Sequence, residues 1–367
     1  MITFGIMTLN MESETSYIDQ IAKLADSCEM ECFRFIPSKI NPHTLLVKGK
    51  KFNAKDQTWA EGEFPIPSIL YDRCFYGDDE HSKQCIPIVS WLKCRNDITF
   101  LGYGLPNKLE LYNVLKNSVL TPYLPPTMKV SNPGEVLKEL KIRNRIILKP
   151  ISGSQGYGIY YVKQNDKSFH VKTEKQKKII SHIFQNELKL NHWLNSLMVQ
   201  RDYLLQPFLE LANDHLQPFD IRILIQKNEH GDWVTRGKGV RQGTTGGILS
   251  NLSSGGSVIR FADWLAFLPP AKREYIRNEL TFITANLPRL LEQEFLPLFE
   301  LGVDIGVARN GAIWILDVNS KPGRKVILET KPELKETLYL APLLYGKHIS
   351  KLEQTERKSS YATTLFS

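Results

Sequence analysis

Short apolar runs and one amphipathic stretch organise the first hundred residues. Residues 2–9 and 32–36 are apolar runs of strand length, and residues 15–28 between them carry apolar side chains at helical spacing. This order predicts a strand, a helix and a second strand in a small α/β layer. Further strands are predicted as a hairpin from 45 to 59 and at 68–71 and 86–92, with Pro65 and Pro67 in the loop after the hairpin.

The pattern changes near residue 105. Asn107-Lys108 opens a segment with apolar residues at helical spacing, and Thr121-Pro122 terminates it. The next predicted elements are a strand after Pro125-Pro126-Thr127, a short helix over 133–141, a strand over 145–149, and a charged, mostly helical segment over 172–199.

The rest of the chain alternates strand and helix patterns, without an internal repeat. The predicted strands are 204–205, 220–226, 233–240, 303–308 and 314–318, and one or two amphipathic helices fall within 271–300. The segment beyond about residue 345 is polar, and we expect it to fray.

Composition places the 367-residue chain among ordinary globular proteins, with 42% hydrophobic and 23% charged residues. The net charge of +8 suits an anionic ligand. Basic runs such as 48–51 and 175–178 are scattered along the chain, which indicates solvated surface rather than a nucleic-acid interface. No apolar stretch approaches the roughly 18 residues of a membrane span, so we expect no membrane insertion.

Five cysteines lie in the first quarter of the chain, without CxxC spacing. Reduced thiols in a cytoplasmic protein are the simplest interpretation, since the N-terminus has no basic segment followed by a long apolar run. A metal site formed by Asp72, Cys74, His81 and Cys85 is an alternative, but their irregular spacing favours buried or loop cysteines.

Two aspartates near the C-terminal end give the sharpest local argument. Asn310-Gly311 between two apolar strands is typical of a two-residue type I′ hairpin turn. That register places Asp304 opposite Asp317, with their Cβ atoms roughly 5 Å apart on one face. Two like charges so placed destabilise the strand pair unless a cation lies between them.

Asn319 lies on the same face by strand periodicity and adds a neutral oxygen. Three oxygen ligands without Cys or His suit Mg²⁺ that is held jointly with phosphates. The alternative is an exposed hairpin with both carboxylates in water, because a longer loop would change the register.

A second candidate element begins at Lys149, at the end of a buried strand, where a lysine is costly unless it meets an anion. The glycine-rich stretch that follows supplies amides and hydroxyls that can close over phosphates. It contains Ser152, Gly153, Ser154, Gln155, Gly156, Tyr157 and Gly158. An ordinary hairpin turn is an equally good interpretation, since the stretch matches neither phosphate-binding glycine motif.

A third element combines Asp220, Arg222 and Arg241 with Asn251 in a glycine-rich surrounding. Strand alternation puts Asp220 and Arg222 on one face. The two arginines could stabilise charge on a transferring phosphoryl group, whereas the alternative is a structural Asp–Arg pair within the sheet. The segment 204–210 by itself resembles an edge strand interrupted by proline.

In chain order these segments resemble the ATP-grasp superfamily, and the whole chain resembles the YheC/YheD family of Bacillus-type spore-coat-associated proteins. The motifs are the helix opened by Lys108, Ile-Leu-Lys-Pro at 147–150, the loop at 152–158, Leu-Gln-Pro-Phe-Leu-Glu at 205–210, Phe-Asp-Ile-Arg at 219–222, and the segment 302–323. The resemblance implies an α/β (α+β) ATP-grasp fold, in which two α+β subdomains grip ATP behind a small N-terminal α/β layer. It is strong over about 105–325 and weaker before it.

The resemblance also implies roles for individual residues. Lys149 and Lys108 would contact the ATP phosphates, and the loop at 152–158 would close over them, with Asn251 also at the nucleotide. Gln206, Phe208 and Leu209 would form the hinge that meets adenine, and Glu210 would face the ribose. Asp304, Asp317 and Asn319 would bind one or two Mg²⁺ ions, while Arg222 and Arg241 would stabilise the transferred phosphoryl group.

The implied activity is ATP-dependent ligation of a carboxylate to an amine or a thiol through an acylphosphate. Many ATP-grasp enzymes have Glu where this chain has Asp317, which is one methylene shorter and could weaken turnover. A non-catalytic ATP-binding spore-coat or assembly protein is therefore a second hypothesis, and a kinase-like transferase is a third. The first hypothesis has an unidentified carboxylate and nucleophile as substrates, and the second has spore-coat proteins as partners at the coat or forespore surface.

The same comparison suggests domain boundaries. We expect an N-terminal domain over 1–104, an ATP-grasp domain over 105–325 with lobes 105–205 and 206–325, and a C-terminal helix and tail over 326–367.

Overall fold

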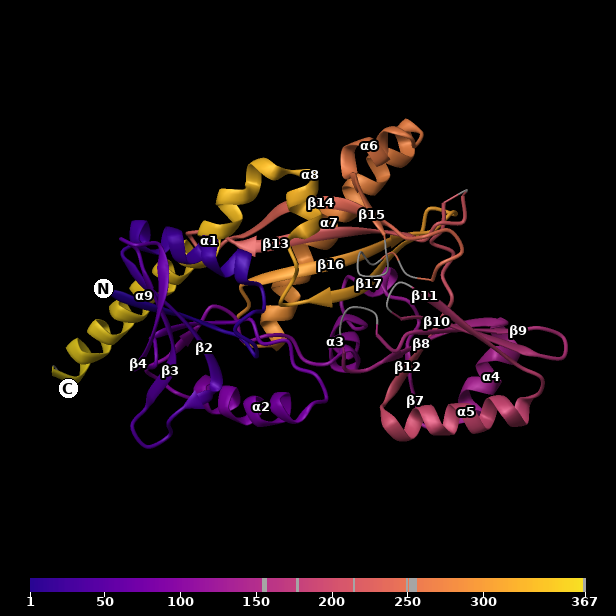
Figure 1. Ribbon diagram of the computed structural model, residues 1–367. Helices are drawn as coiled ribbons and strands as arrows, with labels where there is room; N and C mark the ends of the chain where they lie inside the picture. Colours follow the sequence, from indigo (N-terminus) through magenta and orange to yellow (C-terminus); the bar gives the residue numbers. More distant parts are fainter. Residues whose placement is uncertain (154–156, 176–177, 214, 249, 251–255, 366–367) are drawn as a thin grey trace.

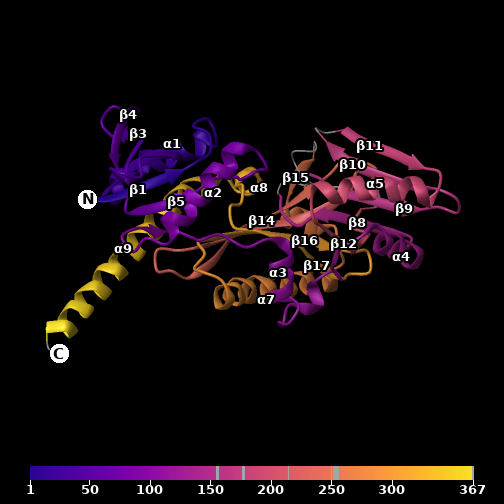
Figure 2. The same ribbon diagram turned by 90° about the horizontal axis from the view of Figure 1, so that it is seen from below.

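Three β-sheets organise the computed structural model (Figure 1), which describes residues 1–365 except 154–156, 176–177, 214, 249 and 251–255. The first sheet lies at the N-terminal end of the molecule and the second at the opposite end, with the third between them (Figures 1 and 2). Short 3-10 helices lie at Asp26–Cys28, Thr121–Tyr123 and Pro332–Leu334.

The first sheet has the order β4-β3-β2-β1-β5-β6. Its strands are β1 (Ile2–Met7), β2 (Met30–Ile40), β3 (Leu46–Asn53), β4 (Thr58–Pro65), β5 (Ile69–Asp72) and β6 (Thr99–Phe100). The strands β2, β1, β5 and β6 are parallel, which requires cover on both faces. Helices α1 (Thr15–Ala25) and α9 (Lys335–Leu365) pack on one face, and α2 (Glu80–Lys93) packs toward the other.

The strand predicted over 86–92 is wrong, because this segment belongs to helix α2. Asp79 caps the helix through a bond from the Ser82 amide, and the buried positions Ser82, Cys85, Val89 and Leu92 follow helical spacing. Pro87 lies inside the helix, which explains why the local pattern favoured an extended segment.

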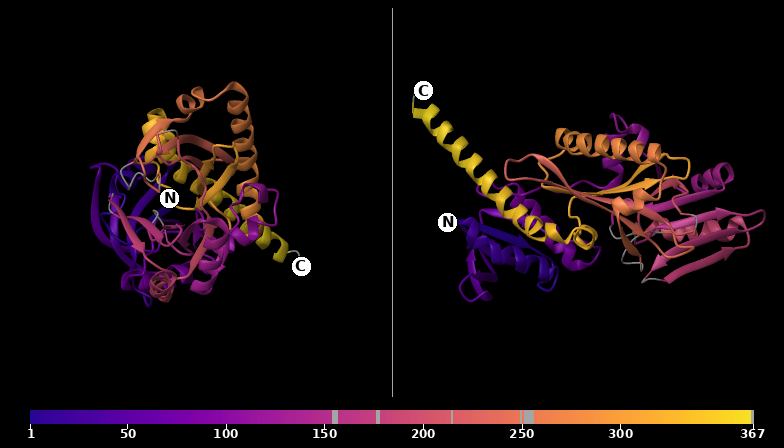
Figure 3. Two further views of the ribbon diagram at one scale, coloured as in Figure 1. Left: turned by 90° about the vertical axis from the view of Figure 1, so that its right-hand side faces the viewer. Right: turned by 90° about the horizontal axis from the view of Figure 1, so that it is seen from above.

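Helix α9 covers the N-terminal layer although it ends the chain (Figure 3). Tyr339, Leu343 and Tyr345 belong to the same buried cluster as Phe4 and Ile18. Beyond residue 345 the same helix continues to Leu365, and its end projects away from the body of the molecule (Figure 3).

The second sheet is antiparallel, with the order β11-β10-β9-β8-β12-β7. Its strands are β7 (Met128–Val130), β8 (Arg145–Pro150), β9 (Tyr160–Gln164), β10 (Phe169–Lys175), β11 (Lys178–Phe184) and β12 (Tyr203–Pro207). Helices α4 (Pro133–Arg143) and α5 (Glu187–Gln200) supply Leu140 and Leu194 to its core. The prediction of a mostly helical 172–199 is wrong in its first half, because β10 and β11 pair with each other there.

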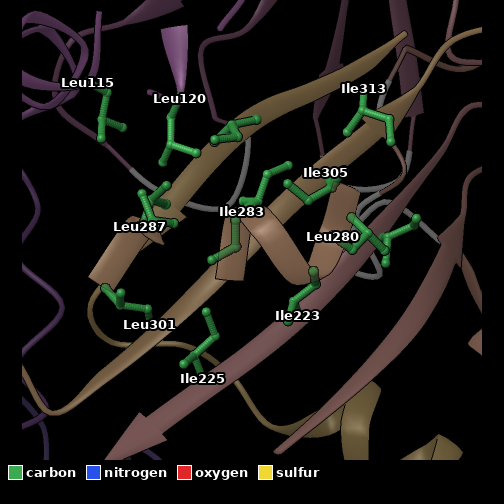
Figure 4. Packing of buried hydrophobic residues seen from close by; sticks show 14 of the residues in the cluster. Leu115, Leu120, Ile223, Ile225, Leu280, Ile283, Leu287, Leu301, Ile305 and Ile313 are labelled. Atoms are coloured by element: carbon green, nitrogen blue, oxygen red, sulfur yellow. The ribbon is translucent and has the colours of Figure 1, made fainter. Parts of the chain in front are cut away.

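The third sheet has the antiparallel order β15-β14-β13-β16-β17. Its strands are β13 (Phe219–Lys227), β14 (Trp233–Gln242), β15 (Ser257–Arg260), β16 (Glu300–Val307) and β17 (Ile313–Asn319). Helices α6 (Phe261–Ala266), α7 (Pro270–Glu294) and α8 (Lys325–Thr330) contact it, and Ile283 and Leu287 of α7 fill one face (Figure 4).

Helix α3 (Lys108–Leu115) packs on this third sheet although it precedes the second sheet in the sequence. Leu111, Leu115 and Leu120 lie in the cluster that contains Leu280 and Ile305 (Figure 4). The start of α3 is thereby fixed next to β17, and the expected domain boundaries stay a prediction. None of the described helices combines the length and the apolar character that a membrane span requires.

Candidate functional site

The hairpin of β16 and β17 places Asp304 directly opposite Asp317, as predicted. The predicted two-residue turn is wrong. The Ala308 amide donates to the Ala312 carbonyl at 2.8 Å, so the loop contains three residues, with Gly311 at a φ of 90°. A loop of this length shifts the pairing next to it by one residue.

A β-bulge restores the register before the aspartates. The pairing shifts between Asp304 and Ile305, where Leu316 is the extra residue on β17. The carbonyl of Leu316 accepts a hydrogen bond from Lys149 Nζ at 3.2 Å. The bulge thus both aligns the two carboxylates and provides a contact to the second sheet, and no signal in the sequence predicted it.

Lys149 reaches this hairpin from the end of β8. Its neighbours Leu148 and Pro150 are buried in the second sheet, so alternation directs the lysine to the opposite face. The pKa of Lys149 is lowered to about 8, chiefly by burial; Asp317 opposes this shift and Lys108 adds to it.

Lys108 is the first residue of α3. Asn107 caps the helix by accepting bonds from the amides of the next turn, and the Lys108 amide itself donates to the Ile151 carbonyl at 3.2 Å. These contacts fix the start of α3 beside the end of β8. Lys108 Nζ then lies 2.5 Å from Asp317 Oδ1.

The two lysines keep the Asp317 carboxyl ionised. Burial by itself would raise the pKa of Asp317, but Lys108 and Lys149 lower it below the ordinary value. Asn319 Nδ2 also donates to Asp317 Oδ2 at 3.3 Å. Lys108, Lys149 and Asp317, predicted from separate segments, are therefore brought together.

A hollow between α3, the second sheet and β17 borders this group. It encloses about 440 Å³ of empty space, part of it open to solvent. Its apolar lining includes Leu111, Leu115, Leu124, Leu204, Ile315, Leu316 and Val318. Lys108, Lys149, Gln206, Thr127 and Asp317 supply polar groups. An apolar hollow with a few convergent polar groups is the usual form of a small-molecule site.

Asp304 faces two arginines. Arg222 pairs with it across the strands, and Arg222 Nη2 donates to Asp304 Oδ2 at 3.0 Å. Arg222 Nε lies 2.5 Å from Asp304 Oδ1, but without hydrogen-bond alignment, so this carboxylate oxygen has no hydrogen-bond partner within the described residues. Arg241 Nη2 lies 2.9 Å from Asp304 Oδ2.

Arg241 also forms a bidentate pair with Asp220, at 2.7 and 2.6 Å, which is the structural pair considered from the sequence. Burial raises the pKa of Asp220, and Asp304 adds to this shift while Arg241 opposes it. Both aspartates raise the pKa of Arg241 despite its burial. Ser250 Oγ donates to Asp220 at 2.5 Å. Arg241 therefore bridges two carboxylates.

The predicted hinge residues follow β12. Gln206 Nε2 donates to Thr127 Oγ1 at 2.6 Å, and Glu210 is exposed and pairs with Arg145 at 2.7 Å. The Phe208 amide donates to the Arg145 carbonyl at 3.2 Å, and Leu209 beside it is half-buried. Their contact with a nucleotide stays a prediction.

The predicted glycine-rich loop is described only in part. Ser152 and Gly153 are exposed after β8, and Gly153 has a φ of 134°. The predicted positions Ser154, Gln155, Gly156 and Asn251 lie outside the described residues.

Sequence reasoning missed a contact between the lobes. Glu174 on β10 is buried and accepts a hydrogen bond from the Ile248 amide, in the glycine-rich segment after β14. The sequence could not reveal this contact, because Glu174 lies in a segment that was predicted to be mostly helical.

Comparison with known proteins supports one family. The family model described as YheC/D like ATP-grasp matches residues 97–349. The chain is 41% identical over 348 residues to endospore coat-associated protein YheC of Bacillus subtilis, with 94% of each chain covered. It is 24% identical over 319 residues to endospore coat-associated protein YheD of the same organism, which covers 84% of this chain and 68% of that protein.

The fold also matches D-alanyl-alanine synthetase A from Vibrio cholerae, with a TM-score of 0.54 over 94% of this chain and 98% of that one. At 11% identity this likeness shows the fold alone. The family to which the order of motifs pointed is thus confirmed. The chain belongs to the YheC/D-like ATP-grasp family and has the ATP-grasp fold.

Proposed function

We propose that this protein is an Mg–ATP-dependent ligase that joins a carboxylate to an amine or a thiol. One observation carries the proposal: Lys108 and Lys149, from different elements, converge on Asp317 at the edge of an apolar hollow. The two lysines would bind phosphate oxygens, and the ionised carboxylate would bind the metal that the phosphates carry.

The nucleotide would lie between the second and third sheets. The phosphates would meet Lys108, Lys149 and the loop at 152–158, with Asn251 nearby. The backbone at Gln206, Phe208 and Leu209 would meet adenine, and Glu210 would face the ribose once it leaves Arg145. The apolar lining near Leu316 supports this placement of the base.

The donor set fits Mg²⁺. Asp304 and Asp317 face each other, Asn319 adds an amide oxygen, and Asp304 Oδ1 lacks a hydrogen-bond partner within the described residues. In the described part of the chain, no three His, Cys, Asp or Glu residues lie close enough together to hold a metal ion by themselves. Phosphate oxygens would have to complete the coordination shell. Mg²⁺ would neutralise phosphate charge and orient the γ-phosphoryl group.

The proposed reaction has two steps. The acceptor carboxylate attacks the γ-phosphorus, which forms an acylphosphate and releases ADP; an amine or thiol then attacks the acyl carbon and releases phosphate. Arg222 and Arg241 would stabilise the transferring phosphoryl group. Positioning and charge neutralisation suffice, so no nucleophilic side chain is required.

ADP release tests the proposal. Purified protein should form ADP with ATP and Mg²⁺ only when a carboxylate acceptor and a nucleophile are added, and Asp317→Ala should abolish this release. Stable ATP binding without ADP formation across a broad panel of carboxylates, amines and thiols would refute ligation.

A second proposal is a non-catalytic ATP-binding protein of the spore coat. The endospore coat-associated names of the two Bacillus subtilis relatives favour it. Tagged protein should then recover defined coat components from sporulating cells only with ATP present. Recovery that does not depend on ATP would contradict a role for the nucleotide as a conformational ligand.

A further inference from the structure

The loop that follows Asn319 is held by the N-terminal layer. It comprises residues 320–324 and begins where β17 ends. Lys321 Nζ lies 2.8 Å from Asp72 Oδ2 and donates to the Cys74 carbonyl at 2.7 Å. The end of β5 is therefore attached directly to the loop that leaves the proposed metal ligands.

Glu300, at the start of β16, is the centre of a second attachment. It is 1% exposed and accepts four hydrogen bonds. Tyr71 and Arg73 donate to one oxygen at 2.6 and 2.9 Å, and Gln226 and Arg324 donate to the other at 2.9 and 2.6 Å. One carboxylate thus joins β5, β13, β16 and the loop.

The two arginines share the carbonyl of Pro322. Arg324 Nη1 donates to it at 2.9 Å, and Arg73 Nη2 donates at 3.4 Å. Arg73 also binds both oxygens of Glu14 at 2.7 Å, and the Arg324 guanidinium lies 3.8 Å from the centroid of the Tyr17 ring. The loop backbone is consequently fixed to the start of α1 as well.

This network balances two arginines against two glutamates; Arg73, Arg324 and Glu300 are buried, and Glu14 is 24% exposed. Buried ion pairs add little net stability compared with an apolar core, because the Coulomb attraction is offset by desolvation. Their directional bonds nevertheless allow one arrangement of the groups that they join. The network is therefore better suited to fixing geometry than to stabilising the fold.

The loop transmits that geometry to the proposed metal site through close packing. Gly302 pairs with Asn319, two residues from Asp304 along β16. A Cβ atom at position 302 would lie 2.7 Å from Pro322 Cβ and 3.0 Å from Arg222 Nη1. Pro322 therefore packs against Gly302 itself, so a displacement of Pro322 would disturb the strand pair that carries the carboxylates.

We propose that Arg73, Glu300 and Arg324 are positioning residues through which the N-terminal layer sets the geometry of Asp317 and Asn319. This inference rests on the proposed Mg–ATP site. Partners that orient metal ligands without touching the metal affect metal affinity by roughly 10- to 100-fold. The N-terminal layer is accordingly part of the metal site's support.

The test replaces Arg73 by lysine. Lysine keeps the charge but cannot bridge Glu14, Glu300 and the loop at once. Calorimetric titration with the non-hydrolysable analogue adenylyl imidodiphosphate is repeated at increasing Mg²⁺. Arg73→Lys should raise the Mg²⁺ concentration for half-maximal binding by about tenfold, with analogue binding in EDTA unchanged.

Two controls separate positioning from general destabilisation. Arg143→Lys makes the same exchange at an exposed pair with Glu139, and Ile18→Val loosens the buried N-terminal core. Both should keep the wild-type Mg²⁺ requirement, although Ile18→Val should lower the melting temperature.

The outcomes discriminate between the two claims. Wild-type protein without Mg²⁺-dependent binding would refute the proposed function, whereas wild-type binding with an unchanged Mg²⁺ requirement in Arg73→Lys would refute only the positioning role. Should Arg73→Lys fail to fold, Arg324→Lys is tested instead. It makes the same exchange at the other arginine that binds Glu300 and the Pro322 carbonyl, so an unchanged requirement there would equally overturn the inference.

Discussion

Replacing Asp317 by asparagine removes one charge from the centre of the site and keeps the side-chain shape. Lys108 loses its carboxylate partner at 2.5 Å, and Lys149 loses the nearby charge that opposes its burial. Removal of the repulsion between Asp304 and Asp317 stabilises the variant and partly offsets these losses. Because hydrogen bonds to charged groups contribute about 1.5–3 kcal/mol and the pair is partly exposed, we expect a loss of about 1 kcal/mol in the free energy of unfolding.

The pH dependence of this loss follows from the shifted carboxyl. The pKa of Asp317 is lower in the folded chain than its ordinary 3.8, so its stabilisation is complete above that value. It is lost as the pH falls through the folded-state pKa. Urea denaturation should therefore separate Asp317→Asn from wild type at pH 7, and the two curves should converge in strong acid.

Asp317→Asn should weaken nucleotide binding far more than it lowers the stability of the fold. Loss of a metal-ligand charge should weaken Mg–ATP binding by at least about a hundredfold, or roughly 2.7 kcal/mol. Asp56→Asn, in the exposed turn between β3 and β4, is the matched control and should bind normally. If Asp317→Asn bound Mg–ATP as tightly as wild type, the assignment of the metal site to this hairpin would be wrong.

Three other predictions follow from single contacts. Lys149→Met should weaken nucleotide binding yet stabilise the nucleotide-free chain at pH 7, because the folded pKa of about 8 lies below the ordinary 10.5; the gain should vanish between those values in pH-dependent melts. Gly302→Ala should lower stability by about 1–3 kcal/mol in thermal melts, through overlap with Pro322. Glu174→Ala should release the Ile248 amide and speed proteolytic cleavage in the segment 243–248, and equal cleavage rates would contradict this contact.

The sequence predicts four strands of the third sheet, β13, β14, β16 and β17, but not the short edge strand β15. It fails at α2 and β11, for opposite reasons. Pro87 disguised a helix whose buried positions follow 3.6-residue spacing. The strand β11 lies mostly exposed at the edge of its sheet, so its sequence shows no alternation of apolar and polar residues. In both places tertiary packing outweighed local propensity.

The facing aspartates were predicted correctly from an incorrect turn. A three-residue loop displaces the pairing by one residue, and the bulge at Leu316 returns it. Neither feature follows from the local pattern, since Asn310-Gly311 suits both turns. The network at Glu300 was beyond sequence reasoning for another reason: Arg73 lies 227 residues away, and only the assembled fold brings the two together.

The charge inventory of the site indicates how a metal would enter it. Among the described residues of the site, four basic side chains lie beside three carboxylates. The basic residues are Lys108, Lys149, Arg222 and Arg241, and the acidic ones are Asp220, Asp304 and Asp317. A bare divalent cation approaching this group would be repelled, whereas Mg–ATP remains an anion and would be attracted. As the phosphates draw Lys108 away from Asp317, a carboxylate becomes available to the metal that they carry. On the proposed function, the facing aspartates would act as a metal site only when the nucleotide is present, and the basic side chains would neutralise them without it.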